Sequence, residues 1–166
     1  MQDEILEIVD IEGKTISIAP RLQLHSQTYL LHKVVHVLVF NTEGELLLQK
    51  RSKNKDIFPG KWDTSVGGHV LPGENILDAA KRETKEELGF MPEEIHFLYS
   101  HIFSGSLERE FVYTFSTTLK ENCEFNKEEI EEIRFWKFQE MQSLIGSGVF
   151  TENLESELQQ YLKRFE

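Results

Sequence analysis

The 166-residue sequence contains one cysteine, Cys123, and so lacks any pair that could form an intramolecular disulfide. A single thiol is typical of a reducing compartment, and we expect a cytoplasmic protein. The sequence also has no apolar run of about 18 or more residues, which excludes a transmembrane helix. Its first residues, MQDEILEIVD, do not have the basic-then-apolar layout of a signal peptide, so we expect no membrane partner.

Basic side chains are scarce as well. The chain has 18 Lys and Arg residues against 29 Asp and Glu residues, a formal net charge of -11. Such a field repels nucleic-acid backbones, so we expect no nucleic-acid partner. No repeat, low-complexity tract or linker divides the sequence, and 39% hydrophobic with 28% charged residues is ordinary for a globular protein. We therefore predict a single domain over residues 1–166.

Short apolar and β-branched runs separated by turn residues predict a strand-rich chain. The expected strands are residues 4–10, residues 15–19, the two arms of a hairpin over 30–52, a short strand after the loop at 59–68, and residues 95–103, 110–118 and 133–138. Helical spacing predicts a central helix over 75–88, a helical turn at 141–145 and a closing helix over 152–164. This order indicates an α/β fold in which a mixed sheet lies between helices.

The central helix has recognisable ends and an apolar seam. Asn75 can cap its N-terminus, and Gly89 can end it. The residues of the predicted buried seam repeat at helical spacing and are Leu77, Ala80, Thr84 and Leu88.

Three carboxylates of this helix, Glu83, Glu86 and Glu87, are predicted to share one face beside the seam, because successive residues are rotated by roughly 100°. Arg82 is placed to neutralise one of them, and Glu74 stands one turn ahead, where it can pair with Arg82. Since like charges repel, the acids either form a solvated face or share a cation. Hard divalent ions such as Mg²⁺ bind oxygen ligands of this kind.

The stretch from Gly68 to Phe90 resembles the Nudix box, G-x5-E-x7-R-E-U-x-E-E-x-G-U, in which U is an aliphatic residue. Thr84 stands where the motif has an aliphatic residue, and Phe90 is aromatic. The resemblance implies the Nudix fold, an α/β/α sandwich with a central mixed β-sheet. It also implies a hydrolase that uses Mg²⁺ (or Mn²⁺) to cleave a diphosphate linked to another moiety. The matching residues are Gly68, Glu74, Arg82, Glu83, Glu86, Glu87, Gly89 and Phe90.

The same resemblance implies a role for each residue of the box. Arg82 would belong to the catalytic motif and would form a salt bridge with Glu74, which supports the loop and the helix. Water would be the nucleophile, activated by a metal or by a nearby carboxylate. The implied metal ligands are Glu86 and Glu87, with Glu83 as a further ligand and the backbone carbonyl of Gly68 completing the site.

A second resemblance surrounds the box. The H-x6-H pair at residues 25 and 32, the QKRS after a leucine-rich strand, the PG-W of residues 59–62 and an E-x-E strand are similar to the isopentenyl diphosphate isomerase branch of the superfamily. In those isomerases three histidines and two glutamates bind one metal, so the resemblance implies a second divalent ion. Imidazole plus carboxylate suits Zn²⁺ or Mn²⁺ better than Mg²⁺ alone. The matching residues are His25, His32, His69, Glu108 and Glu110, and Glu110 is also expected among the catalytic residues.

Gly67 departs from the isomerase pattern, which has a catalytic cysteine at this place. Isomerisation needs an acid and a base on opposite faces of the allylic unit, and glycine supplies neither. The sequence therefore favours a hydrolase of the pyrophosphate bond in a nucleoside diphosphate or another small diphosphate-linked metabolite. The alternatives are an isopentenyl diphosphate delta-isomerase, which performs a 1,3-allylic rearrangement, and a module that binds a nucleotide without turning it over.

Several further residues have two interpretations each. Arg51 and Lys55 either meet the phosphates of the substrate or form a basic surface loop. Glu129 either acts as a base or extra ligand, or belongs to a solvated acidic loop. Phe58 and Trp62 either stack on a base or pack in the core. A homodimer is plausible, although no sequence pattern indicates one.

Overall fold

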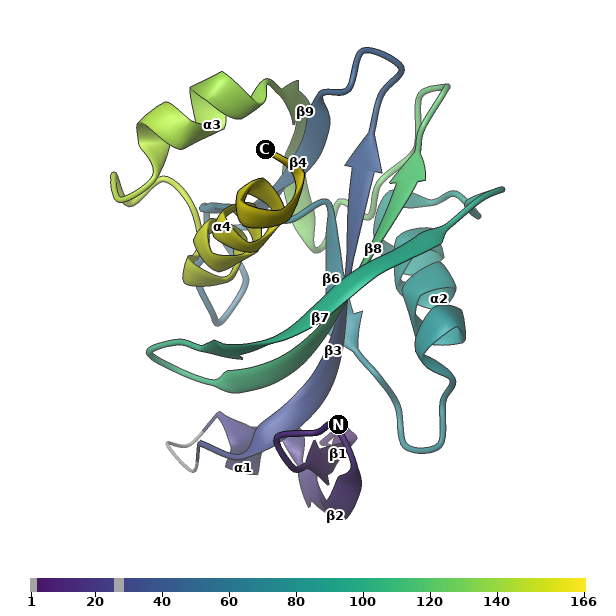
Figure 1. The fold of residues 1–166 in the computed structure, drawn as a ribbon, viewed down its shortest axis with the longest axis vertical. Helices are drawn as coiled ribbons and strands as arrows, with labels where there is room; N and C mark the ends of the chain where they lie inside the picture. Colours follow the sequence, from purple (N-terminus) through teal and green to yellow (C-terminus); the bar gives the residue numbers. More distant parts are fainter. Residues whose placement is uncertain (1–2, 26–28) are drawn as a thin grey trace.

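The computed structural model describes residues 3–25 and 29–166, and in these ranges nine strands form one mixed sheet (Figure 1). The strands are β1 (Ile5–Val9), β2 (Thr15–Pro20), β3 (Leu31–Phe40), β4 (Leu46–Arg51), β5 (Trp62–Asp63), β6 (Val66–His69), β7 (His96–Ser104), β8 (Arg109–Thr118) and β9 (Ile130–Trp136). The helices are α1 (Arg21–Leu24), α2 (Ile76–Leu88), α3 (Phe138–Leu144) and α4 (Glu152–Phe165).

Strand β3 is the centre of the sheet. It pairs in parallel with β8 along its whole length, from Leu31 opposite Arg109 to Phe40 opposite Thr118. On its other side it pairs antiparallel with β6 and, at one end, with β1 of the β1–β2 hairpin. Strand β4 pairs with β5 and β9, but it meets β3 at a single register position, next to their shared turn. The two strands therefore separate beyond the turn, and the candidate site lies between them.

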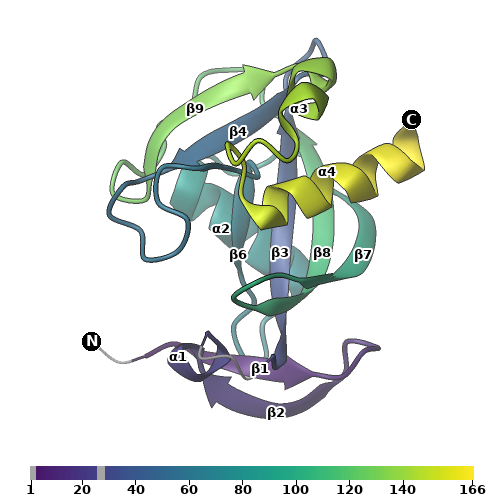
Figure 2. The ribbon, with the colours of Figure 1, turned by 90° about the vertical axis from the view of Figure 1, so that its left-hand side faces the viewer.

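Helices cover both faces of the sheet, with α2 on one side of β3 and α4 on the other (Figures 1 and 2). Side chains of a strand alternate between faces, so β3 contributes to two separate cores. The core under α2 includes Val35, Val37, Val39, Ala79, Ala80 and Leu88, and the core under α3 and α4 includes Leu38, Leu48, Trp136, Met141, Leu154 and Leu158. The expected α/β/α sandwich with a central mixed sheet is confirmed.

The central helix forms where the sequence predicts it. The Leu77 amide donates to Asn75 Oδ1 at 2.9 Å, and Gly89 ends the helix with a φ of 74°, a conformation that glycine adopts without strain. The predicted seam is wrong at Leu77, which is exposed, while Ala79 is fully buried. The buried face is centred on Ala80, Thr84 and Glu87, which leaves Leu77 at its edge in the first turn.

Other boundaries differ slightly from expectation. Strand β9 runs from Ile130 to Trp136, and Phe138 already begins α3, so the predicted strand at 133–138 is shifted toward the C-terminus. The short helix α1 was not expected. None of the helices among the described residues is long and apolar enough to cross a membrane.

Candidate metal and substrate site

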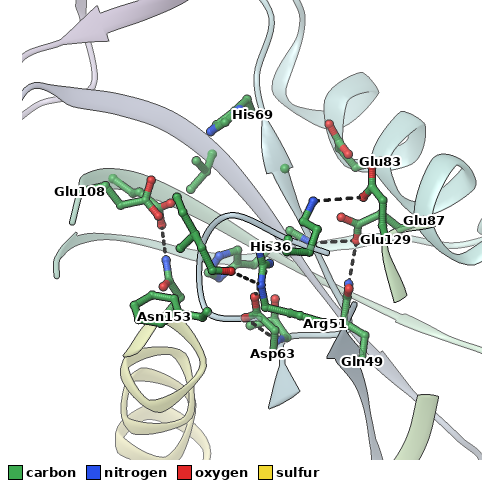
Figure 3. Close-up of a pocket in the computed structure, with 18 of the residues that line it drawn as sticks. His36, Gln49, Arg51, Asp63, His69, Glu83, Glu87, Glu108, Glu129 and Asn153 are labelled. Carbon is green, nitrogen blue, oxygen red and sulfur yellow. Dashed lines mark hydrogen bonds and ion pairs between the residues drawn. The ribbon is translucent and has the colours of Figure 1, made fainter. Parts of the chain in front are cut away.

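A cavity of about 330 Å³ opens between the separated strands β3 and β4 (Figure 3). Its walls come from the sheet, from α2, from the loop between β4 and β5, and from the start of α4. Most lining side chains are charged or polar, and its few apolar ones include Val34, Ile57 and Phe58. Two groups of predicted ligands flank it. The helix cluster is Gly68, Glu83, Glu86 and Glu87, and the histidine cluster is His25, His32, His69, Glu108 and Glu110.

The helix cluster is more buried than a solvated face allows. Glu87 is only 7% exposed, and the side chain of Glu83 is 13% exposed, whereas Glu86 stands at the rim with 57% of its side chain exposed. Gln49 Nε2 donates to Glu87 Oε2 at 2.8 Å, and the Gly67 amide donates to the same oxygen at 3.3 Å. The hydrogen bonds hold one carboxylate oxygen of Glu87 in a fixed direction.

Gly68 lies directly against Glu83. A Cβ atom at position 68 would be 2.1 Å from Glu83 Cδ and 2.5 Å from both carboxylate oxygens. Any side chain there would displace the carboxylate, so glycine is required by this close approach of β6 to α2. The backbone of Gly68 therefore packs directly against the Glu83 carboxylate.

Arg82 ties the acids to the loop that precedes the helix. Its guanidinium donates two hydrogen bonds to Glu74, at 2.7 and 2.9 Å, and one each to Glu83 at 2.7 Å and Glu86 at 3.2 Å. A further bond reaches the backbone oxygen of His69 at 3.0 Å. The hydrogen bond from Arg82 lowers the pKa of Glu74, which therefore stays ionised and holds the Arg82 guanidinium in place.

Burial and mutual repulsion make the helix cluster costly to charge. Burial raises the pKa of Glu83 to about 7 against the opposing bonds from Arg82, and the charges of Glu86 and Glu129 add to the rise. Burial, reinforced by the charge of Glu83, raises the pKa of Glu87 well above its usual range. A divalent cation placed among these oxygens would remove both effects, so the residues present fit a Mg²⁺ or Mn²⁺ ion.

The histidine cluster comes together from distant parts of the chain. His32 lies opposite Glu110 in the parallel β3–β8 pair, and Val34 lies opposite His69 in the β3–β6 pair. Potential ligand atoms of the three histidines lie within 4.8 Å of one another, as do those of His32, Glu108 and Glu110. His25, at the end of α1, has its Nε2 atom 3.1 Å from Glu108 Oε2.

His32 supplies the test of whether this cluster fits a metal. The residue is fully buried, and neither ring nitrogen has a hydrogen-bond partner in the described part of the chain. Burial, together with the charge of His69, lowers its pKa to about 4, so the ring is neutral near pH 7, the form in which imidazole can bind a metal. A buried imidazole with no partner beside two carboxylates fits a divalent ion such as Zn²⁺ or Mn²⁺.

Outer contacts orient two members of the histidine cluster. His69 Nδ1 lies 2.9 Å from Glu4 Oε2, and Asn153, at the start of α4, donates to Glu110 Oε2 at 3.0 Å. Partners of this kind orient metal-binding side chains in many proteins. Burial and the charge of Glu108 raise the pKa of Glu110 well above its usual range, again a state that a cation would relieve.

The expected phosphate-binding residues line the cavity, but they already have partners. Arg51 donates to the backbone oxygen of Ile57 at 2.9 Å and to Asp63 Oδ2 at 3.1 Å. Lys55 Nζ is 3.9 Å from Glu129, which also lines the cavity. Their contact with phosphates therefore stays a prediction.

The two aromatic candidates, Phe58 and Trp62, lie in different environments. Trp62 packs in the α4 core, with its ring 5.1 Å from that of Trp136, so it has the core role. Phe58 lines the cavity with a positive φ of 48° and stays a candidate for stacking. Cys123 packs against the core under α2, and burial raises the pKa of its thiol.

Sequence reasoning missed several functional neighbours. Gln49 is the polar end of a leucine-rich strand and orients Glu87, while Glu4 and Asn153 lie far from the motifs in the sequence. His36 interrupts an apolar run, and its partner Glu157 falls between Leu154 and Leu158 on the buried face of α4. Polar residues at buried positions of otherwise apolar patterns were the available signal.

Comparison with known proteins identifies the family of the chain. The family model of the NUDIX domain matches residues 30–154 of the chain. The chain is 38% identical over 122 residues to an uncharacterized Nudix hydrolase of Listeria monocytogenes, covering 72% of each chain. It is 35% identical over 137 residues to an isopentenyl-diphosphate Delta-isomerase of Streptomyces griseus, covering 79% of this chain and 70% of the isomerase.

Solved structures give the same fold. A crystal structure from Deinococcus radiodurans superposes with a TM-score of 0.83 at 24% identity, covering 95% of this chain and 98% of that one. From the family match and these relatives, the chain belongs to the Nudix family.

Proposed function

We propose that this Nudix protein is a metal-dependent hydrolase that cleaves the pyrophosphate bond of a nucleoside diphosphate or another small diphosphate-linked metabolite in the cytoplasm. The observation that carries this proposal is the burial of Glu83 and Glu87 together, with pKa values raised by burial and by their proximity. Such carboxylates are costly without a cation and well placed with one.

The helix cluster would hold Mg²⁺ or Mn²⁺ through Glu83, Glu86, Glu87 and the Gly68 carbonyl. The ion would supply charge neutralisation at the diphosphate and a more acidic water. Arg82 and Glu74 keep the loop and helix in place, and Gln49 fixes one oxygen of Glu87. Glu129 lies close enough to Glu83 and Glu87 to raise the pKa of both, so it is a candidate base for the attacking water.

The histidine cluster would hold a second divalent ion on the opposite side of the cavity (Figure 3). In this proposal Glu110 is both a ligand of that ion and a neighbour of the reacting groups, and Asn153 fixes its orientation. A diphosphate between two cations would have its charge balanced from both ends.

An isomerase is the second candidate, because the histidine cluster assembles as the isomerase resemblance implies and an isomerase is among the relatives. Two observations count against it. Position 67 is glycine, which has no thiol. Cys123 packs against the core under α2 and does not line the cavity. The predominantly polar lining also offers little apolar surface for an isoprenoid chain.

A turnover screen with product masses tests the proposal. Purified protein is incubated with Mg²⁺ or Mn²⁺ and nucleoside diphosphates, nucleoside triphosphates, dinucleotides, nucleotide sugars or isopentenyl diphosphate. Release of phosphate or a nucleoside monophosphate supports the hydrolase and identifies its substrate class. Conversion to dimethylallyl diphosphate without phosphate release supports the isomerase. Binding of a nucleotide without any product would indicate a sensing module.

A further inference from the structure

A buried polar network lies between β3 and α4, outside both ligand clusters. His36 Nδ1 is 2.6 Å from Glu157 Oε2, and Tyr99 donates its hydroxyl hydrogen to Glu157 Oε1 at 2.5 Å. Thr114 Oγ1 lies 3.0 and 3.1 Å from the two carboxylate oxygens. The side chain of Glu157 is only 1% exposed. A buried carboxylate with this many neighbours is held in one position.

The direction of the His36–Glu157 hydrogen bond follows from the charge of the carboxylate. Burial alone would raise the pKa of Glu157, but the hydrogen bond and charge of His36 outweigh it, and the pKa lies below its usual range. An ionised carboxylate only accepts hydrogen bonds, so the hydrogen lies on His36 Nδ1. This leaves Nε2 as the ring nitrogen available for another partner.

The free edge of the His36 ring faces the cavity. His36 lines it, and its register partner across β3 and β6 is Gly67. A Cβ atom at position 67 would be 3.5 Å from His36 Cδ2 and 3.8 Å from Nε2, which is ordinary contact. The space over Gly67 therefore has room for a methyl-sized group beside Nε2, and among the described residues the His36 ring bonds through Nδ1 alone. In Figure 3 His36 lies between Glu108 on one side and Glu83 and Glu87 on the other.

We propose that His36 is a substrate-contacting residue and that Glu157 is its positioning residue. In the complex the ring lies between the Glu157 carboxylate and an anionic phosphate and takes up a second proton from water, so that Nδ1 donates to Glu157 and Nε2 donates to a phosphate oxygen lying over Gly67. The inference rests on the proposed hydrolase function, because it places the diphosphate between the two clusters. Arg51 and Arg82 already bind carboxylates, whereas the cavity-facing nitrogen of His36 does not. A purely structural role would be to fasten α4 to the sheet through the His36–Glu157 pair. Apolar side chains at positions 36 and 157 could do this at least as well. A structural role therefore does not explain why the His36 ring reaches the cavity.

Two variants of His36 separate a substrate contact from a structural role. In His36→Asn the amide nitrogen falls near the place of Nδ1, so the bond to Glu157 can persist while the reach of Nε2 is lost. In His36→Gln the amide nitrogen falls near Nε2, so a donor to the cavity persists while the bond to Glu157 is lost. The control is His96→Gln on β7, where the side chain is 67% exposed and is not part of the cavity lining.

The probe is inorganic pyrophosphate in the presence of Ca²⁺, with dissociation constants from calorimetry and melting temperatures from scanning. We expect His36→Asn to weaken binding by about tenfold or more, the usual effect of losing a hydrogen bond to a charged group. His36→Gln should bind more tightly than His36→Asn although it melts at a lower temperature. Glu157→Gln should weaken binding too, and should abolish the downfield Nδ1 proton signal of wild type in NMR spectra.

The inference would be overturned if pyrophosphate affinity and melting temperature fell together across the variants, with His36→Gln binding more weakly than His36→Asn. The His36–Glu157 pair would then have only a structural role. So would a wild-type His36 Nε2 nitrogen resonance that does not move on saturation with pyrophosphate. If wild type itself bound no pyrophosphate with any divalent ion, the hydrolase proposal would fail, and this inference with it. Failure of this inference alone has a different result: wild type would bind pyrophosphate, and the His36 and Glu157 variants would bind it with the affinity of wild type.

Discussion

At the scale of single residues, the site depends on acids that the fold takes out of water. Glu87 is buried on the face of α2 that packs on the sheet, although helical spacing predicted it beside the seam. Two hydrogen bonds hold it, yet burial still dominates its pKa. An uncharged polar side chain would be less costly at this position, so a buried carboxylate here fits the proposed cation site.

Glu87→Gln is expected to lower kcat by two or more orders of magnitude on the best substrate, because it removes a ligand charge from the helix cluster. The melting temperature of the metal-free variant should be equal to or above that of wild type, because a buried carboxylate has been replaced by a neutral group. Steady-state kinetics and thermal denaturation measure both. Near-normal turnover would contradict a metal site on α2.

Glu83 predicts a pH dependence of the metal-free protein. Its pKa is about 7 in the folded protein, above the usual value of 4.5, so the folded state favours the protonated form. The stability that this proton contributes is complete below pH 4.5 and is lost as the pH rises through 7. The free energy of unfolding should fall over this window by about 3 kcal/mol. Denaturant titrations should show a flatter profile for Glu83→Gln, and saturating Mg²⁺ should flatten that of wild type; identical slopes would refute the assignment.

At the scale of elements, the site exists because two hairpin arms separate and because β6 approaches α2 closely. The sequence predicted the helix, its caps and most strands from periodicity and turn residues, which are local signals. It could not predict that β4 and β3 part beyond their turn, since that depends on their pairing with β5, β6 and β9. The Nudix spacing identified Gly68 and the acids, whereas the His36–Glu157 pair joins residues 121 positions apart and leaves no local pattern.

Two neighbouring glycines of β6 provide a matched test of that close approach. Gly68→Ala places a Cβ atom 2.1 Å from Glu83 Cδ, whereas Gly67→Ala meets nothing closer than 3.4 Å. We expect Gly68→Ala to weaken Mn²⁺ binding at the helix cluster by at least about tenfold, which corresponds to about 1.4 kcal/mol. Gly67→Ala should bind Mn²⁺ as wild type does. Titration followed by electron paramagnetic resonance of free Mn²⁺ compares the two, and equal affinities would show that Gly68 is not part of the site.

At the scale of the whole molecule, the sheet places two clusters of candidate metal ligands around one cavity. The helix cluster comes from one motif, and the histidine cluster comes from β3, β6, β8 and the end of α1. The single domain and the homodimer stay predictions. Light scattering after size-exclusion chromatography would measure whether the protein is a dimer. The two clusters differ in ligand chemistry, so they should also differ in metal preference and in their share of the reaction.

His69→Ala tests that division. We expect a smaller loss of hydrolysis than in Glu87→Gln, together with the loss of about one equivalent of bound Zn²⁺ or Mn²⁺, because His69 is one of several ligands in the histidine cluster. Metal analysis of dialysed protein and steady-state kinetics give the two numbers. An equal loss of activity would mean that the second site takes part in the chemistry.

The central claim is that the helix cluster holds the ion on which hydrolysis depends. The most direct measurement is anomalous X-ray scattering from crystals soaked in Mn²⁺, for wild type and for Glu87→Gln. We predict a wild-type peak among the carboxylates of Glu83, Glu86 and Glu87 and the Gly68 carbonyl, weakened or absent in the variant. A catalytically active protein with no peak there, or with manganese only at the histidine cluster, would contradict the claim.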